Sequence, residues 1–129
     1  MNKKSLSRLA WLPSEVTQLE ARIVELMREY ITTAAQQGAS RLTWIRMEII
    51  QLDASITKTM KEHTDGLAWI ESIADPFLRM IFRLRCIEGR SWGSVAFRIG
   101  GNTPDSVRMA HNRYLGIELD DDEDDYLRA

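Results

Sequence analysis

The sequence predicts an all-α protein with a long helical hairpin in its N-terminal part and a compact three-helix, helix-turn-helix unit in its C-terminal part. Three observations lead to this fold class. Apolar residues recur at spacings of three and four through most of the 129 residues. Only three prolines interrupt the chain, and glycines and capping residues fall between the periodic segments. The alternation of polar and apolar residues that marks a strand is scarce.

Residues 1–13 are polar and carry lysines, with Trp11 as their largest side chain. We expect them to form a flexible lead, because chain ends are usually loosely ordered. A basic arm that adds a DNA contact is the alternative interpretation.

Residues 14–64 are expected to form an antiparallel hairpin of two long helices. The first helix begins with Ser14 as its cap and ends near Ala35, and the second runs from about Ser40 to about His63. The short break between them favours an antiparallel pair. Besides the seam that joins the helices, each has a second apolar stripe, formed by Val24, Met27 and Ile31 on the first and by Trp44 and Met60 on the second. Either the C-terminal unit or a second copy of the chain covers these stripes, and the second case gives a homodimer through residues 14–62.

Residues 65–117 are expected to form the helix-turn-helix unit. It opens with a short connecting helix from Leu67 to Ile73, capped by Asp65 and Gly66. Three further helices follow, each bounded by a capping residue and a glycine. The first starts at Asp75-Pro76 and stops at Gly89. The second starts at Ser91 and stops at Gly100-Gly101, and the third starts at Thr103-Pro104 and stops at Gly116.

The third of these helices is predicted to be the recognition helix. At about 100° per residue, Val107, Ala110 and Tyr114 point toward a small core whose largest apolar side chain is Trp92. Arginine and asparagine on the opposite side can bond guanine and adenine edges. The residues predicted nearest the bases are Arg108, Asn112 and Met109, and those predicted toward the backbone are Arg90, Ser91, Arg98, Asn102, Thr103 and Arg113.

The charge distribution favours a nucleic-acid partner. Between Arg79 and Arg113 there are seven arginines and two acidic residues, a net charge of +5 in a chain whose formal net charge is −2. A local basic face of this kind is what phosphate binding requires. The acidic balance comes from the tail, residues 118–129, where seven acids stand between Glu118 and Asp125. Such a block is typically a solvated tail, although it can also fold over Arg108 and Arg113 or bind a basic partner.

The run from Arg85 to Leu115 resembles region four of bacterial sigma factors, and more closely the small sigma-like helix-turn-helix proteins of phages and prophages. The resemblance is carried by Arg85, Ile87, Gly89, Ser91, Trp92, Val95-Ala96, Ile99-Gly100, Val107-Arg108 and Asn112-Arg113-Tyr114-Leu115. It implies double-stranded DNA as the partner, a role in phage transcription, and RNA polymerase as a candidate second partner. The turn before the last helix is one residue longer here than in the usual pattern, so that helix is expected at a different angle.

A sequence-specific DNA-binding transcriptional regulator is therefore the predicted function. Two alternatives stay open, a phage terminase small subunit and a helical protein-interaction module. No catalytic set, cofactor motif or metal-ligand set can be assembled from the residues, so neither an enzyme nor a cofactor is expected. The single cysteine, Cys86, and the lack of a signal-peptide core or membrane span favour the cytoplasm of a bacterial host cell.

Overall fold

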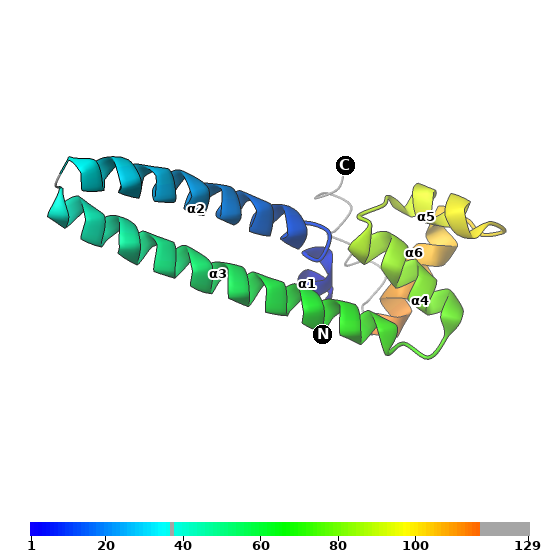
Figure 1. Ribbon diagram of the computed structural model, residues 1–129. Helices are drawn as coiled ribbons and strands as arrows, with labels where there is room; N and C mark the ends of the chain where they lie inside the picture. The colour runs from blue at the N-terminus through cyan, green and yellow to red at the C-terminus, as the bar shows by residue number, and fades with distance from the viewer. Residues whose placement is uncertain (37, 117–129) are drawn as a thin grey trace. The chain divides into compact units, whose positions relative to one another are not determined.

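The computed structural model describes residues 1–36 and 38–116, and these residues are all-helical. They divide into two compact units (Figure 1). Unit 1 contains residues 1–10 together with the chain from Thr64 onward, and unit 2 contains Trp11–His63. The expected acidic tail, residues 118–129, lies outside the described residues. None of the described helices is both long and apolar enough to cross a membrane.

Unit 2 is a hairpin of two long helices that run side by side in opposite directions (Figure 1). Helix α2 spans Leu12–Ala35 and helix α3 spans Ala39–Glu71, of which residues up to His63 belong to this unit. Leu26 and Ile45 are completely buried. Helix α2 begins at Leu12, before the predicted cap Ser14, because Pro13 lies in its first turn, where the missing amide is harmless.

In place of the expected flexible lead, the start of unit 1 is a short helix, α1, Lys3–Ser7. Asn2 caps it by accepting a hydrogen bond from the Ser5 amide at 2.8 Å. Leu6 and Leu9 are buried. Their burial explains the difference, because two leucines withdrawn from water stabilise a segment that its polar neighbours alone would leave loosely ordered.

The predicted break at Asp65-Gly66 is wrong, because α3 continues through both residues to Glu71. Gly66 is buried, and a Cβ built on it would lie 2.3 Å from Leu9 Cδ2. The glycine therefore makes room for a leucine side chain instead of ending a helix. Ile70, on the turn that follows, is also buried and joins the core of unit 1.

Replacing Gly66 by alanine is expected to lower the free energy of unfolding by about 1 to 2 kcal/mol, since overpacking against Leu9 outweighs the better helix propensity of alanine. Gly93 is a matched control, because the nearest atom to a Cβ there is Ser91 Oγ at 3.9 Å. Gly93→Ala is expected to raise stability by about 0.5 to 1 kcal/mol. Chemical denaturation measures both changes, and equal stabilisation by both would contradict the packing of Leu9 on Gly66.

Three short helices complete unit 1: α4, Pro76–Phe82; α5, Trp92–Ile99; and α6, Pro104–Leu115. The predicted caps are confirmed. Asp75, Ser91 and Thr103 each accept a hydrogen bond from a backbone amide in the first turn of the helix that follows. Gly89, Gly100 and Gly116 follow the helix ends with positive φ angles of 68°, 79° and 72°.

The core shared by α4, α5 and α6 is small and apolar. Trp92 belongs to it, as predicted. Between α4 and Gly89 the chain makes one π-helical turn, η1, Arg83–Ile87. This wider turn brings three consecutive residues, Leu84, Arg85 and Cys86, into the interior. The buried members of the apolar cluster are Ile81, Leu84, Trp92, Val95, Ala96 and Val107.

Candidate nucleic-acid interface

The buried side of α6 differs from the predicted one. Val107, His111 and Asn112 are buried, whereas Tyr114 is exposed and Ala110 is half-buried. The buried arc is thus turned by about one residue position, ~100°, toward His111. The outward arc consists of Asp105, Ser106 and Arg113, which are exposed, and Met109, which lies on the same side of the helix but is half-buried.

Asn112 cannot read a base edge, contrary to the prediction, because its side chain is 0% exposed. Its Oδ1 accepts a hydrogen bond from His111 Nδ1 at 2.9 Å. Since a carbonyl oxygen only accepts, Nδ1 is the donor in this hydrogen bond. The other ring nitrogen, Nε2, faces Cys86 Sγ at 4.0 Å. Asn112 therefore belongs to the interior of unit 1.

Aromatic rings hold α6 in this orientation. Phe82 stacks on the His111 ring with a centroid distance of 4.5 Å, and Trp92 meets the same ring edge-on at 5.0 Å. Phe82 also contacts Trp69 at 5.4 Å and Tyr114 at 5.5 Å. Such pairs add to the stabilisation that burial alone gives. The ring of His111 consequently fixes which side of α6 faces inward.

Arg85, which contributes to the predicted basic face, is buried. Its guanidinium lies 4.2 Å above the centre of the Trp92 ring, in a cation–π contact. Its NH1 donates a hydrogen bond to the Arg90 carbonyl at 3.0 Å. This arginine therefore stabilises the turn between η1 and α5, and its guanidinium is not accessible to a phosphate.

Two of the predicted DNA contacts, Arg90 and Arg108, are held by acidic neighbours. Arg90 Nε donates to Glu88 Oε1 at 2.9 Å, and its NH1 donates to Ser94 Oγ at 3.1 Å. Arg108 NH2 lies 3.5 Å from Asp105 Oδ1, and its side chain is only 22% exposed. Neither arginine presents its full charge to the solvent.

Arg83, on η1, is paired with Glu71 at the end of α3. Arg83 Nε donates to Glu71 Oε1 at 2.8 Å. This hydrogen bond, with the charges of Arg83 and Arg79, holds the pKa of the Glu71 carboxyl below its usual value against a smaller opposing effect of desolvation. Because the folded-state pKa is depressed, the pair stabilises unit 1 at neutral pH, and this contribution is lost as the pH falls through that pKa.

Arg98 and Arg113 differ from these arginines. Both are exposed, and neither makes an ion pair with another residue of the described ranges. Arg98 lies in the last turn of α5 and Arg113 in the last turn of α6. They are the predicted arginines whose charge the fold leaves available to an anionic partner.

Three predicted polar contacts serve mainly as caps and turn residues. Thr103 and Ser106 form a reciprocal capping box, with Ser106 N donating to Thr103 Oγ1 at 3.1 Å and Thr103 N to Ser106 Oγ at 3.2 Å. Asn102 Nδ2 donates to the Gly100 carbonyl at 3.0 Å. Ser91 Oγ accepts from the Ser94 amide at 3.2 Å. These side chains fix the direction in which α5 and α6 begin.

Phe97 is an exposed aromatic residue that the sequence analysis missed. It is 86% exposed and lies next to Arg98. The signal was available, because Phe97 falls outside the set at positions 92, 95, 96 and 99 that helical spacing places inward. Phe97 and Arg98 line one hollow together with Met80, Arg83, Leu84 and Glu88, so this part of the candidate surface lies between α5 and the α4–η1 segment.

Comparison with known families, with curated proteins and with solved structures gives no match. Function is therefore inferred from this chain's own residues. Among the described residues, no group of three or more histidine, cysteine and acidic side chains is placed to hold a metal ion.

Proposed function

We propose that the chain is a DNA-binding regulator of transcription whose α4–α6 region acts as a sigma region four-like helix-turn-helix. In this proposal α6 enters the major groove and α5 lies across the phosphate backbone. The observation that carries it is the pair of exposed arginines, Arg98 and Arg113, on two consecutive helices that share one core. RNA polymerase, suggested by the family resemblance, is part of the proposal as a second partner.

The proposal keeps some of the expected roles and changes others. Met109 stays a base-contacting candidate, and Arg113, which was expected toward the backbone, joins it because both lie on the outward arc of α6. Arg98 keeps its expected phosphate contact, since it stands at the end of the preceding helix. Asn112 has no role in recognition, and Arg108 contributes only if it exchanges Asp105 for a phosphate.

Selecting bound duplexes from a random pool at a fixed, stated salt concentration is the first test, because it returns the target sequence if one exists. Salt-dependent binding to duplex DNA is the expected result. If affinity for duplex DNA is absent at low salt, the proposal is wrong and a protein-interaction module is favoured.

Arg98→Ala and Arg113→Ala are expected to weaken DNA binding in different ways. Arg98→Ala should reduce affinity for all duplexes alike and lower the salt slope by about 1. Arg113→Ala should cost about 1 to 3 kcal/mol on the selected sequence and less on random duplexes. Fluorescence anisotropy at several salt concentrations measures both effects.

Arg22→Ala provides a matched control for these two variants. Arg22 is an exposed arginine of α2 that pairs with Glu25 at 3.1 Å, and it lies outside unit 1. Its replacement changes the net charge by the same amount as Arg98→Ala or Arg113→Ala. We expect its affinity and salt slope to match those of the wild type. Equal losses in all three variants would mean that net charge alone, and not the α5–α6 surface, governs binding.

The terminase alternative is separated from transcriptional regulation by stoichiometry. Small terminase subunits combine a helix-turn-helix with helical oligomerisation, and the exposed apolar stripe of unit 2 is compatible with both functions. A ring of many subunits in light scattering would favour DNA packaging, whereas a monomer or dimer favours the regulator.

A further inference from the structure

The hairpin of unit 2 has two chemically different faces. On one face two ion pairs form within the unit. Arg41 Nε donates to Glu29 Oε1 at 2.8 Å across the two helices, and Arg22 pairs with Glu25 along α2. Arg41 also lies 4.2 Å above the ring of Trp44. Arg22 and Arg41 are therefore already paired within one copy of the chain.

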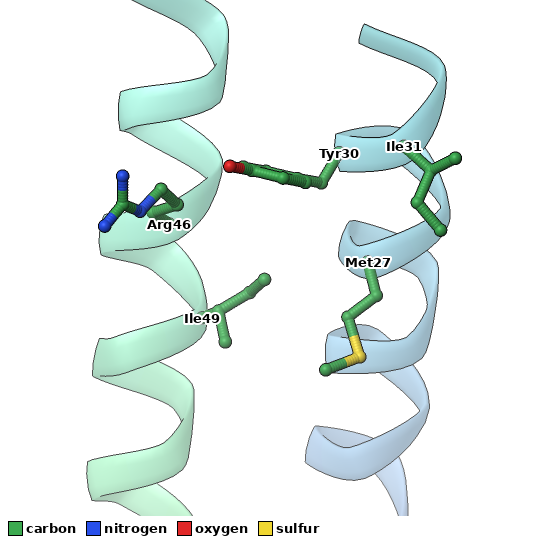
Figure 2. A pocket seen from close by; sticks show the side chains of 5 residues that line it. All are labelled: Met27, Tyr30, Ile31, Arg46 and Ile49. Carbon is green, nitrogen blue, oxygen red and sulfur yellow. The ribbon is translucent and has the colours of Figure 1, made fainter. Parts of the chain in front are cut away.

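The other face contains an open groove between α2 and α3. Met27, Tyr30, Ile31, Arg46 and Ile49 line it, and its volume is about 630 Å³. Figure 2 shows Tyr30 reaching across toward α3, with Met27 and Ile49 on opposite walls. The surface of this groove is predominantly apolar. We call this side of the hairpin the groove face.

Large apolar side chains on the groove face are exposed. Ile31 is 71% exposed, Ile50 is 68% exposed, and Val24 and Met27 are about half exposed. Helical spacing puts Val24, Met27 and Ile31 on one side of α2. Several exposed large apolar side chains on one side of a small helical unit mark an interaction surface.

Two opposite charges flank the apolar centre of this face on α3. Arg46 and Asp53 are exposed, and neither makes an ion pair with another residue of the described part of the chain. They are seven residues apart in the sequence, which on a helix means the same side and a separation of about 10 Å. Their midpoint falls between Ile49 and Ile50.

We propose that the groove face binds the groove face of a second copy, in an antiparallel dimer whose two-fold axis passes between Ile49 and Ile50. In an isologous contact, residues equally distant from the axis meet their counterparts. Arg46 of each copy then faces Asp53 of the other, so the symmetry forms two ion pairs. In a parallel arrangement, α2 of one copy lies opposite α3 of the other, and Arg46 does not face Asp53.

The same axis also matches the apolar residues of α2. Residues 36 and 38 flank the turn between the helices, so the level of residues 49–50 on α3 corresponds to that of about residues 24–25 on α2. Val24 lies at this level. Val24 of one copy therefore packs close to Val24 of the other, near the two-fold axis.

The available area is sufficient for a specific dimer. About 20 residues of each helix face the partner, which gives a length of about 30 Å and, for two helices, a width of about 20 Å. Each copy then loses about 600 Å² of surface, or about 1,200 Å² for the pair, within the size range of stable interfaces.

The oligomeric state of the full chain tests the proposal. Sedimentation or light scattering over a concentration series is expected to show a dimer. Ile50→Glu is expected to give a monomer with unchanged helical circular dichroism, because Ile50 is already exposed within one copy. Gln51→Glu, also exposed but on the neighbouring side of the helix, is the matched control and should remain a dimer. A wild-type monomer, or a dimer that survives Ile50→Glu, would overturn the proposal.

Charge reversal tests the antiparallel pairing. Arg46→Asp and Asp53→Arg each create two like-charge contacts, and each is expected to raise the dimer dissociation constant about tenfold. The double variant with both changes restores the pairs and should return the constant to near the wild-type value. If neither single variant weakens the dimer, the antiparallel register is wrong. These outcomes do not depend on DNA binding, so they can fail or succeed independently of the proposed function.

Discussion

Replacing Phe82 by alanine is expected to lower the free energy of unfolding by about 3 to 5 kcal/mol. Phe82 is completely buried at the end of α4. It contacts Trp69 from α3, and His111 and Tyr114 from α6. Its removal therefore leaves a cavity where three segments of unit 1 meet. Chemical denaturation followed by near-ultraviolet circular dichroism measures the loss, because Trp69 and Tyr114 report on this packing.

Phe97→Ala is the matched control, since the same side chain is deleted from a position that is 86% exposed. We expect a change within about 0.5 kcal/mol, as for other surface substitutions. If both phenylalanine variants lose stability equally, Phe82 is not the centre of the core of unit 1.

The helix limits in the C-terminal part could be predicted because local chemistry determines them. Asp75, Ser91 and Thr103 cap helices through their own side-chain oxygens. Proline follows two of these caps, and glycine follows the ends of the same helices at positive φ. Each of these preferences acts within a few residues and needs no knowledge of the tertiary fold.

The course of α3 through Gly66 could not be predicted in the same way. Asp65-Gly66 has the composition of a helix break, but the deciding contact is with Leu9, more than fifty residues earlier in the chain. Burial of Leu9 and Ile70 outweighs the poor helix propensity of one glycine, which is only about 1 kcal/mol. Long-range packing therefore overrides the local signal.

Helical periodicity mispredicts the orientation of α6, because it counts polar residues as outward residues. His111 and Asn112 are polar, yet they are buried and hydrogen-bond to each other inside the core. Tyr114 is apolar over most of its ring, yet it packs at the edge of Trp69 and Phe82 and stays partly exposed. A short helix with few strongly apolar residues has a weak periodic signal. One buried polar pair is therefore enough to make the observed buried side differ from the predicted one.

Asn112→Ala is expected to lower the free energy of unfolding by about 2 to 3 kcal/mol. The change removes the oxygen that accepts from His111 Nδ1 and leaves that buried donor without its partner. The loss is limited because Asn112 Nδ2 makes no hydrogen bond to the described residues, so its removal costs nothing in hydrogen bonding. Thermal or chemical denaturation of the purified variant measures the effect.

Arg113→Ala, one position further along α6, is expected to give the opposite result. Its side chain is exposed, so stability should change by less than about 0.5 kcal/mol while DNA affinity falls. Asn112→Ala, assayed at a temperature where it is folded, should retain wild-type affinity because its side chain does not reach the surface. The two neighbouring variants thus separate an interior role from a binding role. A folded Asn112→Ala protein that loses base preference while Arg113→Ala keeps it would mean that the opposite side of α6 faces the DNA.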